Sequence, residues 1–261
     1  MDRVLVIGAT GSIGRVVVPA LAAHGLHPVG AVRDLDRAQE LLPHAEHVTA
    51  DVTDHDALVT ALRGADGIVM VHGSDSSAED VDYGAVPAVL DAVEGARPRI
   101  VLMTSMAVTH ATGSWREIMH WKARGERLLR ASGLPFTIIR PGWFDEEPSG
   151  HDAVRIEQGD GTPVDSRRGV ARRHIAQAIV QSLLHDEAIG VTFELFSAPG
   201  GDPTDWRSAF AALAKDPVGS LDAALCVPGA PLAAEPVRVQ QDIARLGAGP
   251  RDEGPKGGQV R

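Results

Sequence analysis

Short apolar runs alternate with helix-forming stretches along most of the chain. The runs that we predict to be strands are Val4–Ile7, Pro28–Val32, His47–Thr49, Gly67–Val71, Ile100–Thr104, Phe136–Ile139 and Val191–Phe196. The stretches that we predict to be helices are Arg15–Ala23, Asp36–Leu42, Asp56–Leu62, Ala85–Glu94, Lys122–Ala131 and Ala171–Leu184. Strands separated by helices pair in parallel, and strands that are apolar throughout are covered on both faces. The sequence therefore predicts an α/β fold with a doubly wound parallel sheet and a ligand at the carboxyl ends of its strands.

A glycine-rich turn lies between the first predicted strand and the first predicted helix, with the spacing G-x-x-G-x-x-G. Gly8 permits a tight turn, Gly11 lets the backbone approach phosphate oxygens, and Gly14 lets the helix pack closely on the strand. The helix N-terminus adds free N–H groups for an anion. An ordinary turn also fits the triplet, but its place between strand and helix favours a dinucleotide pyrophosphate. We therefore predict cofactor contacts from the loop residues Gly8, Thr10, Gly11, Ser12, Ile13 and Gly14.

The length of 261 residues suits one large domain with an appended lobe. We predict a single NAD(P)-binding Rossmann domain over residues 1–225, with a small C-terminal substrate lobe formed mainly by 143–168 and 191–225. A helix is predicted over Asp202–Ala214. The Pro- and Gly-rich stretch 226–261 is predicted to be a tail that is flexible or contacts another subunit.

Composition excludes several classes of partner. A net charge of −10 and a pI near 5.5 argue against a nucleic-acid surface, which requires a basic face. The single cysteine, Cys226, cannot form an internal disulfide, and no apolar stretch or signal peptide indicates a membrane or export. No further ligand completes a metal shell around His44 and His47, so we predict no metal. We expect a cytoplasmic protein.

The cofactor type is predicted from the end of the second strand, where Arg33 precedes Asp34. A guanidinium here pairs with the 2′-phosphate of NADP(H), whereas a carboxylate binds the free ribose hydroxyls of NAD(H). Arg33 could instead be a solvated residue and Asp34 a helix cap. We favour NADP(H) over NAD(H). Asp51 and Val52 follow the third strand, where they could flank the adenine; a loop cap is the alternative for Asp51.

Four segments together resemble the atypical short-chain dehydrogenase/reductase superfamily, in its NAD(P)H-binding, NmrA-like branch. They are Gly8–Arg15, Asp51-Val52, Thr104–Met106 and Arg140–Phe144, and the likeness covers roughly residues 1 to 200. The resemblance implies that Pro141, Trp143 and Phe144 lie beside the nicotinamide and that Ser105 ends the strand next to it. It also implies a possible homo-oligomer.

The chain departs from this superfamily at its proton donor. In the reductases, a tyrosine four residues before a lysine supplies the proton, and the lysine holds the nicotinamide ribose. Lys122 matches the lysine, but Ile118 stands in the tyrosine position. Tyr83, the only tyrosine, lies ahead of another predicted helix, where packing is the favoured role. The resemblance therefore implies a ribose-binding role for Lys122.

The missing acid leaves three substitutes and three functions open. Candidate proton or hydrogen-bond donors are His120, Ser105 and His110, each of which could instead be structural. The favoured function is an NADPH-dependent reductase of a quinone-like or conjugated molecule, because such an acceptor forms a weakly basic anion. The alternatives are an NADP(H)-binding redox sensor, and a nicotinamide-assisted isomerase, epimerase or dehydratase. Trp115, Trp121, Trp143 and Phe144 could form a wall for a flat aromatic substrate.

Overall fold

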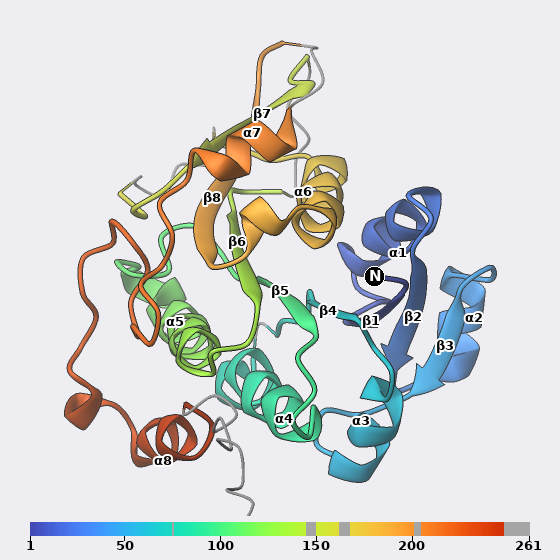
Figure 1. The fold of residues 1–261 in the computed structure, drawn as a ribbon, viewed down its shortest axis with the longest axis horizontal. Helices are drawn as coiled ribbons and strands as arrows, with labels where there is room; N and C mark the ends of the chain where they lie inside the picture. Colours follow the sequence, from blue (N-terminus) through green and yellow to red (C-terminus); the bar gives the residue numbers. More distant parts are fainter. Residues whose placement is uncertain (75, 145–149, 162–167, 201–204, 248–261) are drawn as a thin grey trace, which may run out of the picture.

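One eight-stranded sheet forms the centre of the molecule (Figure 1). The computed structural model describes residues 1–74, 76–144, 150–161, 168–200 and 205–247. The strand order is β3-β2-β1-β4-β5-β6-β8-β7, and every neighbouring pair is parallel except β7 with β8. The strands are β1 Arg3–Ile7, β2 His27–Val32, β3 Glu46–Thr49, β4 Gly67–Met70, β5 Arg99–Met103, β6 Phe136–Pro141, β7 Ala153–Glu157 and β8 Val191–Ala198. The predicted α/β Rossmann-like fold is confirmed.

Helices cover both faces of the sheet. One core layer contains buried side chains of α1, α2, α6 and α7, and the other contains those of α3, α4, α5 and α8 (Figure 1). The helices are α1 Gly14–Ala23, α2 Leu35–Leu41, α3 His55–Leu62, α4 Ala85–Ala92, α5 Arg116–Ala131, α6 Arg172–Leu184, α7 Trp206–Ala211 and α8 Val237–Leu246. Short helical turns lie at η1 Ala78–Tyr83, η2 Gly113–Trp115, η3 Asp186–Ala188 and η4 Leu232–Ala234. No helix among the described residues is long and apolar enough to cross a membrane.

The structure differs from the predicted elements in three places. All seven predicted strands are present, and they pair in parallel as expected; the sheet has one further edge strand that was not predicted, β7, which runs antiparallel to β8. No residue of β7 is fully buried, and its sequence lacks the continuous apolar run of the inner strands. Helix α5 begins at Arg116, six residues before the predicted start, because its first turns are amphipathic and exposed. The π-helical turn η1 was not predicted.

The predicted tail contains an ordered helix. In α8, Val239 and Ile243 are buried in the core layer of α4 and α5. Two apolar residues four apart place one stripe of the helix against that layer. Upstream of it, Glu235 accepts hydrogen bonds from Arg124 and Arg127 of α5. Residues 232–246 therefore pack on this molecule, whereas 248–261 lie outside the described residues.

A buried charge cluster fixes α5 against the sheet. Glu126 on α5 accepts hydrogen bonds from Arg140 on β6, from Arg130 and from Thr104, at 2.6 to 3.0 Å. Burial alone would raise the pKa of Glu126, but the two arginines outweigh it and lower the pKa to about 2. A buried carboxylate is tolerated only when it is paired and hydrogen-bonded in this way. The cluster therefore sets the position of the helix that carries Lys122.

Candidate functional site

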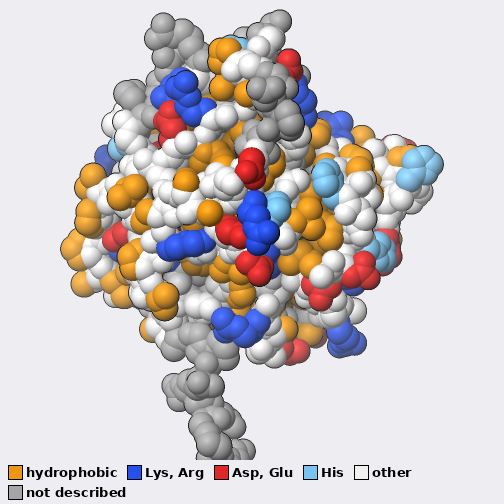
Figure 2. Space-filling view, turned by 45° about the horizontal axis from the view of Figure 1, so that its top comes forward, with side chains coloured by type: hydrophobic (Ala, Val, Ile, Leu, Met, Phe, Trp, Pro, Cys, Tyr) orange, Lys and Arg blue, Asp and Glu red, His pale blue; other side chains and the backbone are white. Residues whose placement is uncertain are grey.

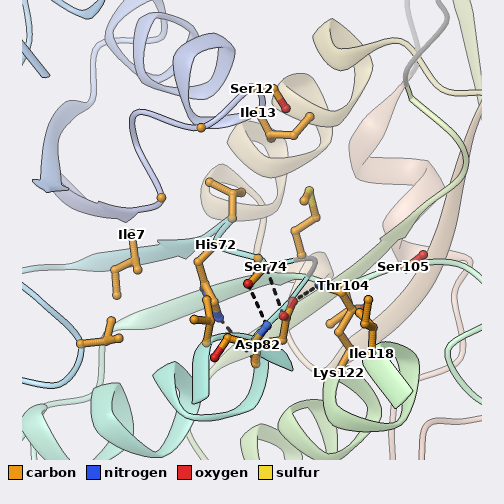
Figure 3. Close-up of a pocket in the computed structure, with 18 of the residues that line it drawn as sticks. Ile7, Ser12, Ile13, His72, Ser74, Asp82, Thr104, Ser105, Ile118 and Lys122 are labelled. Atoms are coloured by element: carbon orange, nitrogen blue, oxygen red, sulfur yellow. Dashed lines mark hydrogen bonds and ion pairs between the residues drawn. The ribbon is translucent and has the colours of Figure 1, made fainter. Parts of the chain in front are cut away.

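A cavity of about 1200 Å³ opens at the carboxyl ends of β1, β2, β4, β5 and β6. This is where ligands bind in open parallel sheets. We call the part lined by 8–13, Arg33 and Asp51 the loop end. We call the part lined by His72, Asp82, Ile118 and Lys122 the lysine end. Figure 3 shows the loop residues Ser12 and Ile13 on one side of the cavity and the lysine-end side chains on the other.

The glycine loop is shaped by close backbone contacts. Gly8 has φ +89°, and a Cβ there would lie 2.9 Å from the backbone N of His72. A Cβ on Gly14 would lie 2.2 Å from the carbonyl oxygen of Gly8, so α1 begins in direct contact with the end of β1. No side chain caps the first turn of α1. The loop therefore presents backbone to the cavity at a helix N-terminus, which suits a pyrophosphate.

Most of the predicted site residues line this cavity. They are Gly8, Thr10, Gly11, Ser12, Ile13, Arg33, Asp51, Val52, Ser105, Lys122, Trp143 and Phe144. Gly14 and Pro141 are not among its lining residues. Gly14 packs beneath the loop, and Pro141 is buried at the end of β6, where its carbonyl accepts a hydrogen bond from the Met106 N–H. Pro141 therefore supports the Ser105–Met106 segment by this hydrogen bond, and its place beside the nicotinamide stays a prediction.

Arg33 and Asp34 have separate roles at the loop end. Arg33 lines the cavity, while the Asp34 carboxylate accepts a hydrogen bond from the Arg37 N–H and caps α2. Asp51 also lines the cavity but accepts from the backbone and hydroxyl of Thr53. These hydrogen bonds lower the pKa of Asp51. The cation of the pair therefore faces the predicted ribose position, while the anion stabilises the helix.

At the lysine end, Lys122 is held by an aspartate that the sequence analysis missed. Its Nζ donates to Asp82 Oδ1 at 2.5 Å. Asp82 comes from η1, and Figure 3 shows it between His72 and Lys122, with Ile118 beside the lysine. Tyr83 is fully buried, its ring packs against Trp121 at a tilt of 50°, and its hydroxyl donates a hydrogen bond to Asp242 of α8. Tyr83 therefore packs, and it does not replace the absent tyrosine.

His72 is a second missed residue of the lysine end. Its Nε2 lies 3.4 Å from the Asp82 carbonyl, and its buried Nδ1 has no hydrogen-bond partner in the described part of the chain. Burial and the Lys122 ammonium lower the pKa of His72 to about 4, so its imidazole is neutral at pH 7. His72 lies just beyond the end of β4, a position that the rule for parallel sheets marks as ligand-facing.

Aromatic and apolar side chains form the wall next to the lysine end. Trp115, Trp143 and Phe144 line the cavity, and the Trp115 and Trp143 rings meet edge to face with centroids 6.1 Å apart. Ile118 and Met119 continue this apolar surface. Trp121, predicted to belong to the wall, is instead buried in the core beside Tyr83, on another face of α5.

The two histidines considered as acids lie elsewhere. His120 faces a shallow depression with Arg116, Glu117 and Arg124, outside the lining of the cavity. Partial burial and the two arginines lower its pKa, which disfavours a protonated imidazole. The Nε2 atom of His110 lies 2.6 Å from the carbonyl of Asp160. Neither histidine is therefore placed to protonate a substrate in the cavity, and of the three predicted donors only Ser105 lines it.

Charged side chains on the surface are mixed in sign. On the face shown in Figure 2, basic and acidic groups are interspersed among apolar atoms. That face therefore has no single basic patch of the kind that binds nucleic acid. Within the described residues there is also no group of three His, Cys, Asp or Glu side chains that could hold a metal.

Comparison with known proteins identifies the family to which the chain belongs. The model of a family described as NAD(P)H-binding matches residues 8–186. An uncharacterized sugar epimerase, YhfK, of Bacillus subtilis is 27% identical over 209 residues, covering 74% of this chain and 93% of the relative. Sanguinarine reductase of Eschscholzia californica is 26% identical over 246 residues, covering 76% and 90%. The solved structure of the oxidoreductase ylbE from Lactococcus lactis superposes with a TM-score of 0.68 at 20% identity, covering 81% and 96%.

Proposed function

Because the chain belongs to the NAD(P)H-binding family, of the atypical short-chain dehydrogenase/reductase type, we propose that it is an NADPH-dependent reductase of a flat, conjugated small molecule such as a quinone. The observation that carries this proposal is the contrast within one cavity. Its loop end fits a dinucleotide, while its lysine end has a lysine and an apolar wall but Ile118 where a proton donor is usual. Sanguinarine reductase, among the relatives, supports reduction of a polycyclic acceptor.

The residues present fit a dinucleotide. Gly8 and Gly11 line the cavity, and a Cβ on either would lie 2.9 to 3.2 Å from neighbouring backbone atoms, so a side chain at these positions would strain the loop that faces the pyrophosphate. Arg33 is placed for a 2′-phosphate and Lys122 for the ribose next to the nicotinamide. When bound, the nicotinamide supplies the hydride.

The remaining chemistry belongs to side chains of the wall. The Ser105 hydroxyl donates a hydrogen bond to an acceptor carbonyl, and the Trp115, Trp143 and Phe144 rings pack against a flat ligand and exclude water. A hydroquinone anion is far less basic than an alkoxide, so water can protonate it. A simple ketone would need the acid that Ile118 lacks. The acceptor class therefore follows from the missing tyrosine.

The preference for NADPH rests on the separate roles of Arg33 and Asp34. The Arg33 guanidinium lines the loop end, and the Asp34 carboxylate that would repel a 2′-phosphate caps α2 instead. Isothermal titration with NADPH and NADH tests this preference. Tighter binding of NADH would contradict it.

The experiment that tests the reductase is an acceptor panel followed by NADPH absorbance. We expect turnover with quinones and conjugated polycyclic ketones and none with aliphatic ketones. The opposite pattern would refute the proposed acceptor class.

A redox sensor is the second candidate, and the observation that favours it is Ile118 beside Lys122. Tight NADP(H) binding with no turnover across the same panel would favour the sensor over the reductase. A nicotinamide-assisted isomerase, epimerase or dehydratase is the third candidate, which the epimerase among the relatives supports. It would convert its substrate without net consumption of cofactor.

We further propose a cytoplasmic location and a possible homo-oligomer. Light scattering on the purified chain measures the oligomer, and fractionation of the source cells measures the location.

A further inference from the structure

The ion pair between Lys122 and Asp82 is buried at the lysine end. The side chains of Asp82 and Lys122 are 1% and 14% exposed. An exposed surface pair contributes little, but removing one partner of a buried pair leaves a costly unpaired charge. The arrangement of these two groups is therefore well determined.

The segment that follows β4 contacts both members of this ion pair. The second oxygen of Asp82, Oδ2, accepts a hydrogen bond from the Ser74 N–H at 3.1 Å. A Cβ on Gly73 would lie 3.4 Å from Asp82 Oδ1 and 3.6 Å from Lys122 Nζ, so the glycine backbone passes close to both. His72, neutral at pH 7, adds no competing charge. Lys122 and Arg33 are the only cations among the described lining residues, and Arg33 lies at the loop end.

Asp82 is itself held from outside the cavity. It lies on the π-helical turn η1, a rare geometry that is frequent at functional sites. The next residue, Tyr83, is anchored by its hydrogen bond of 2.9 Å to Asp242 on α8. Arg238 of α8 also lies within ion-pair distance of Glu79 and Asp80 on the same turn. The C-terminal helix thus fixes the turn that presents the carboxylate.

We propose that Asp82 is a positioning residue. Its carboxylate holds the Lys122 ammonium at the lysine end, aimed at the nicotinamide ribose. The two N–H groups of Lys122 that do not meet Asp82 are then left to donate to ribose hydroxyls. This inference rests on the proposed function, because it assumes that Lys122 binds a nicotinamide ribose.

Lysine labelling of the cofactor-free protein tests the hold on Lys122. The chain has three lysines, Lys122, Lys215 and Lys256, so reductive methylation followed by peptide mass spectrometry resolves each rate. We expect Lys122 to react about tenfold faster in Asp82→Asn than in the original chain, because the carboxylate that pairs with its ammonium is lost. Lys215, bonded to the carbonyls of Glu187 and Ile189, is the internal control and should not change. Equal Lys122 rates in the two proteins would overturn the proposal.

A control variant and a second measurement distinguish the loss of this ion pair from a general loss of structure. Asp152→Asn removes an exposed ion pair with Arg173 outside the cavity and should leave Lys122 labelling unchanged. If Asp82→Asn does not fold, Lys122→Met reports on the same contact, since it leaves the Asp82 carboxylate buried without its cation. We expect a lower Tm for Lys122→Met, and a Tm equal to that of the original chain would overturn the proposal.

A double-mutant cycle on NADPH binding tests whether Asp82 acts through Lys122. We expect Asp82→Asn to raise the Kd about tenfold and the double variant with Lys122→Met to bind no worse than Lys122→Met alone. A purely structural role predicts that the two effects multiply, and that result would overturn the inference. If the original chain gives no heat with NADPH, the proposed function itself fails, which is a different outcome from a failure of Asp82→Asn alone.

Discussion

The two ends of the cavity are built in different ways. The loop end consists largely of consecutive backbone, residues 8–13, with Arg33 and Asp51 from the next two strand ends. The lysine end is assembled from side chains far apart in the chain: Lys122 Nζ meets Asp82, 40 residues away, and α8 holds the turn that carries it. A site built from one short stretch with regularly spaced glycines tolerates few changes but can be recognised directly in the sequence. A site built from distant side chains depends on the packing that brings them together, so no single stretch of sequence reveals it.

The largest effect that we predict breaks the loop end. In Gly14→Ala, the new Cβ would lie 2.2 Å from the Gly8 carbonyl and 2.5 Å from the Ala9 carbonyl. Backbone must then move, which lowers the free energy of unfolding by about 1–3 kcal/mol and removes measurable NADPH binding. Calorimetry and chemical denaturation check both quantities. Gly161→Ala, where a Cβ meets nothing within 4 Å, is the matched control. Unchanged NADPH affinity in Gly14→Ala would show that the loop does not cradle the phosphates.

The second prediction concerns a variant that adds a tyrosine to the lysine end. Ile118→Tyr places a phenol four residues before Lys122 on α5, facing the cavity. A positioned general acid contributes at least about 100-fold, so we expect that gain in kcat/KM for simple ketones. Ile118→Phe supplies the same ring without the hydroxyl and should show no gain. A ketone activity of Ile118→Tyr no higher than that of Ile118→Phe would mean that Lys122, paired with Asp82, cannot support a tyrosine.

The difference between the two ends also explains which features could be predicted from the sequence. The seven parallel strands and the glycine loop were predicted because short apolar or β-branched runs and fixed glycine spacing are local signals. Lys122 and Ile118 were predicted from a motif on one helix. Asp82 was missed because its partner lies 40 residues away and a π-helical turn has no periodic signature. His72 could have been found, since it directly follows a buried strand. Helix α8 was missed because its two buried residues lie in a Pro- and Gly-rich region.

The third prediction concerns the buried charge cluster around Arg140, which positions the helix of Lys122. Burial raises the pKa of Glu194 to about 7, although Arg140 opposes the shift. A raised pKa means that this group contributes stability below about pH 4.5, its ordinary value, and that the contribution is lost as the pH rises through 7.

Glu194→Gln removes that titration and keeps one acceptor oxygen at a place where Glu194 now accepts from Arg140 with one oxygen and from the Asp160 N–H with the other. We therefore expect the variant to gain stability relative to the original chain between pH 5 and pH 8, by about 2 kcal/mol. Chemical denaturation at several pH values measures the difference. A difference that is constant with pH would contradict the assignment of this titration to Glu194.

The smallest predicted effect is a change in nucleotide affinity at the loop end. Arg33→Ala removes a guanidinium that lines the cavity and is placed for the 2′-phosphate, while Asp34 continues to cap α2. A charge-assisted hydrogen bond to phosphate is worth about 1.5–3 kcal/mol, so we expect the Kd for NADPH to rise about tenfold. NADH lacks this phosphate and serves as the matched ligand, with an unchanged Kd. Equal losses for both nucleotides would assign Arg33 to the shared part of the cofactor. Selection between the two nucleotides would then have to arise elsewhere in the cavity.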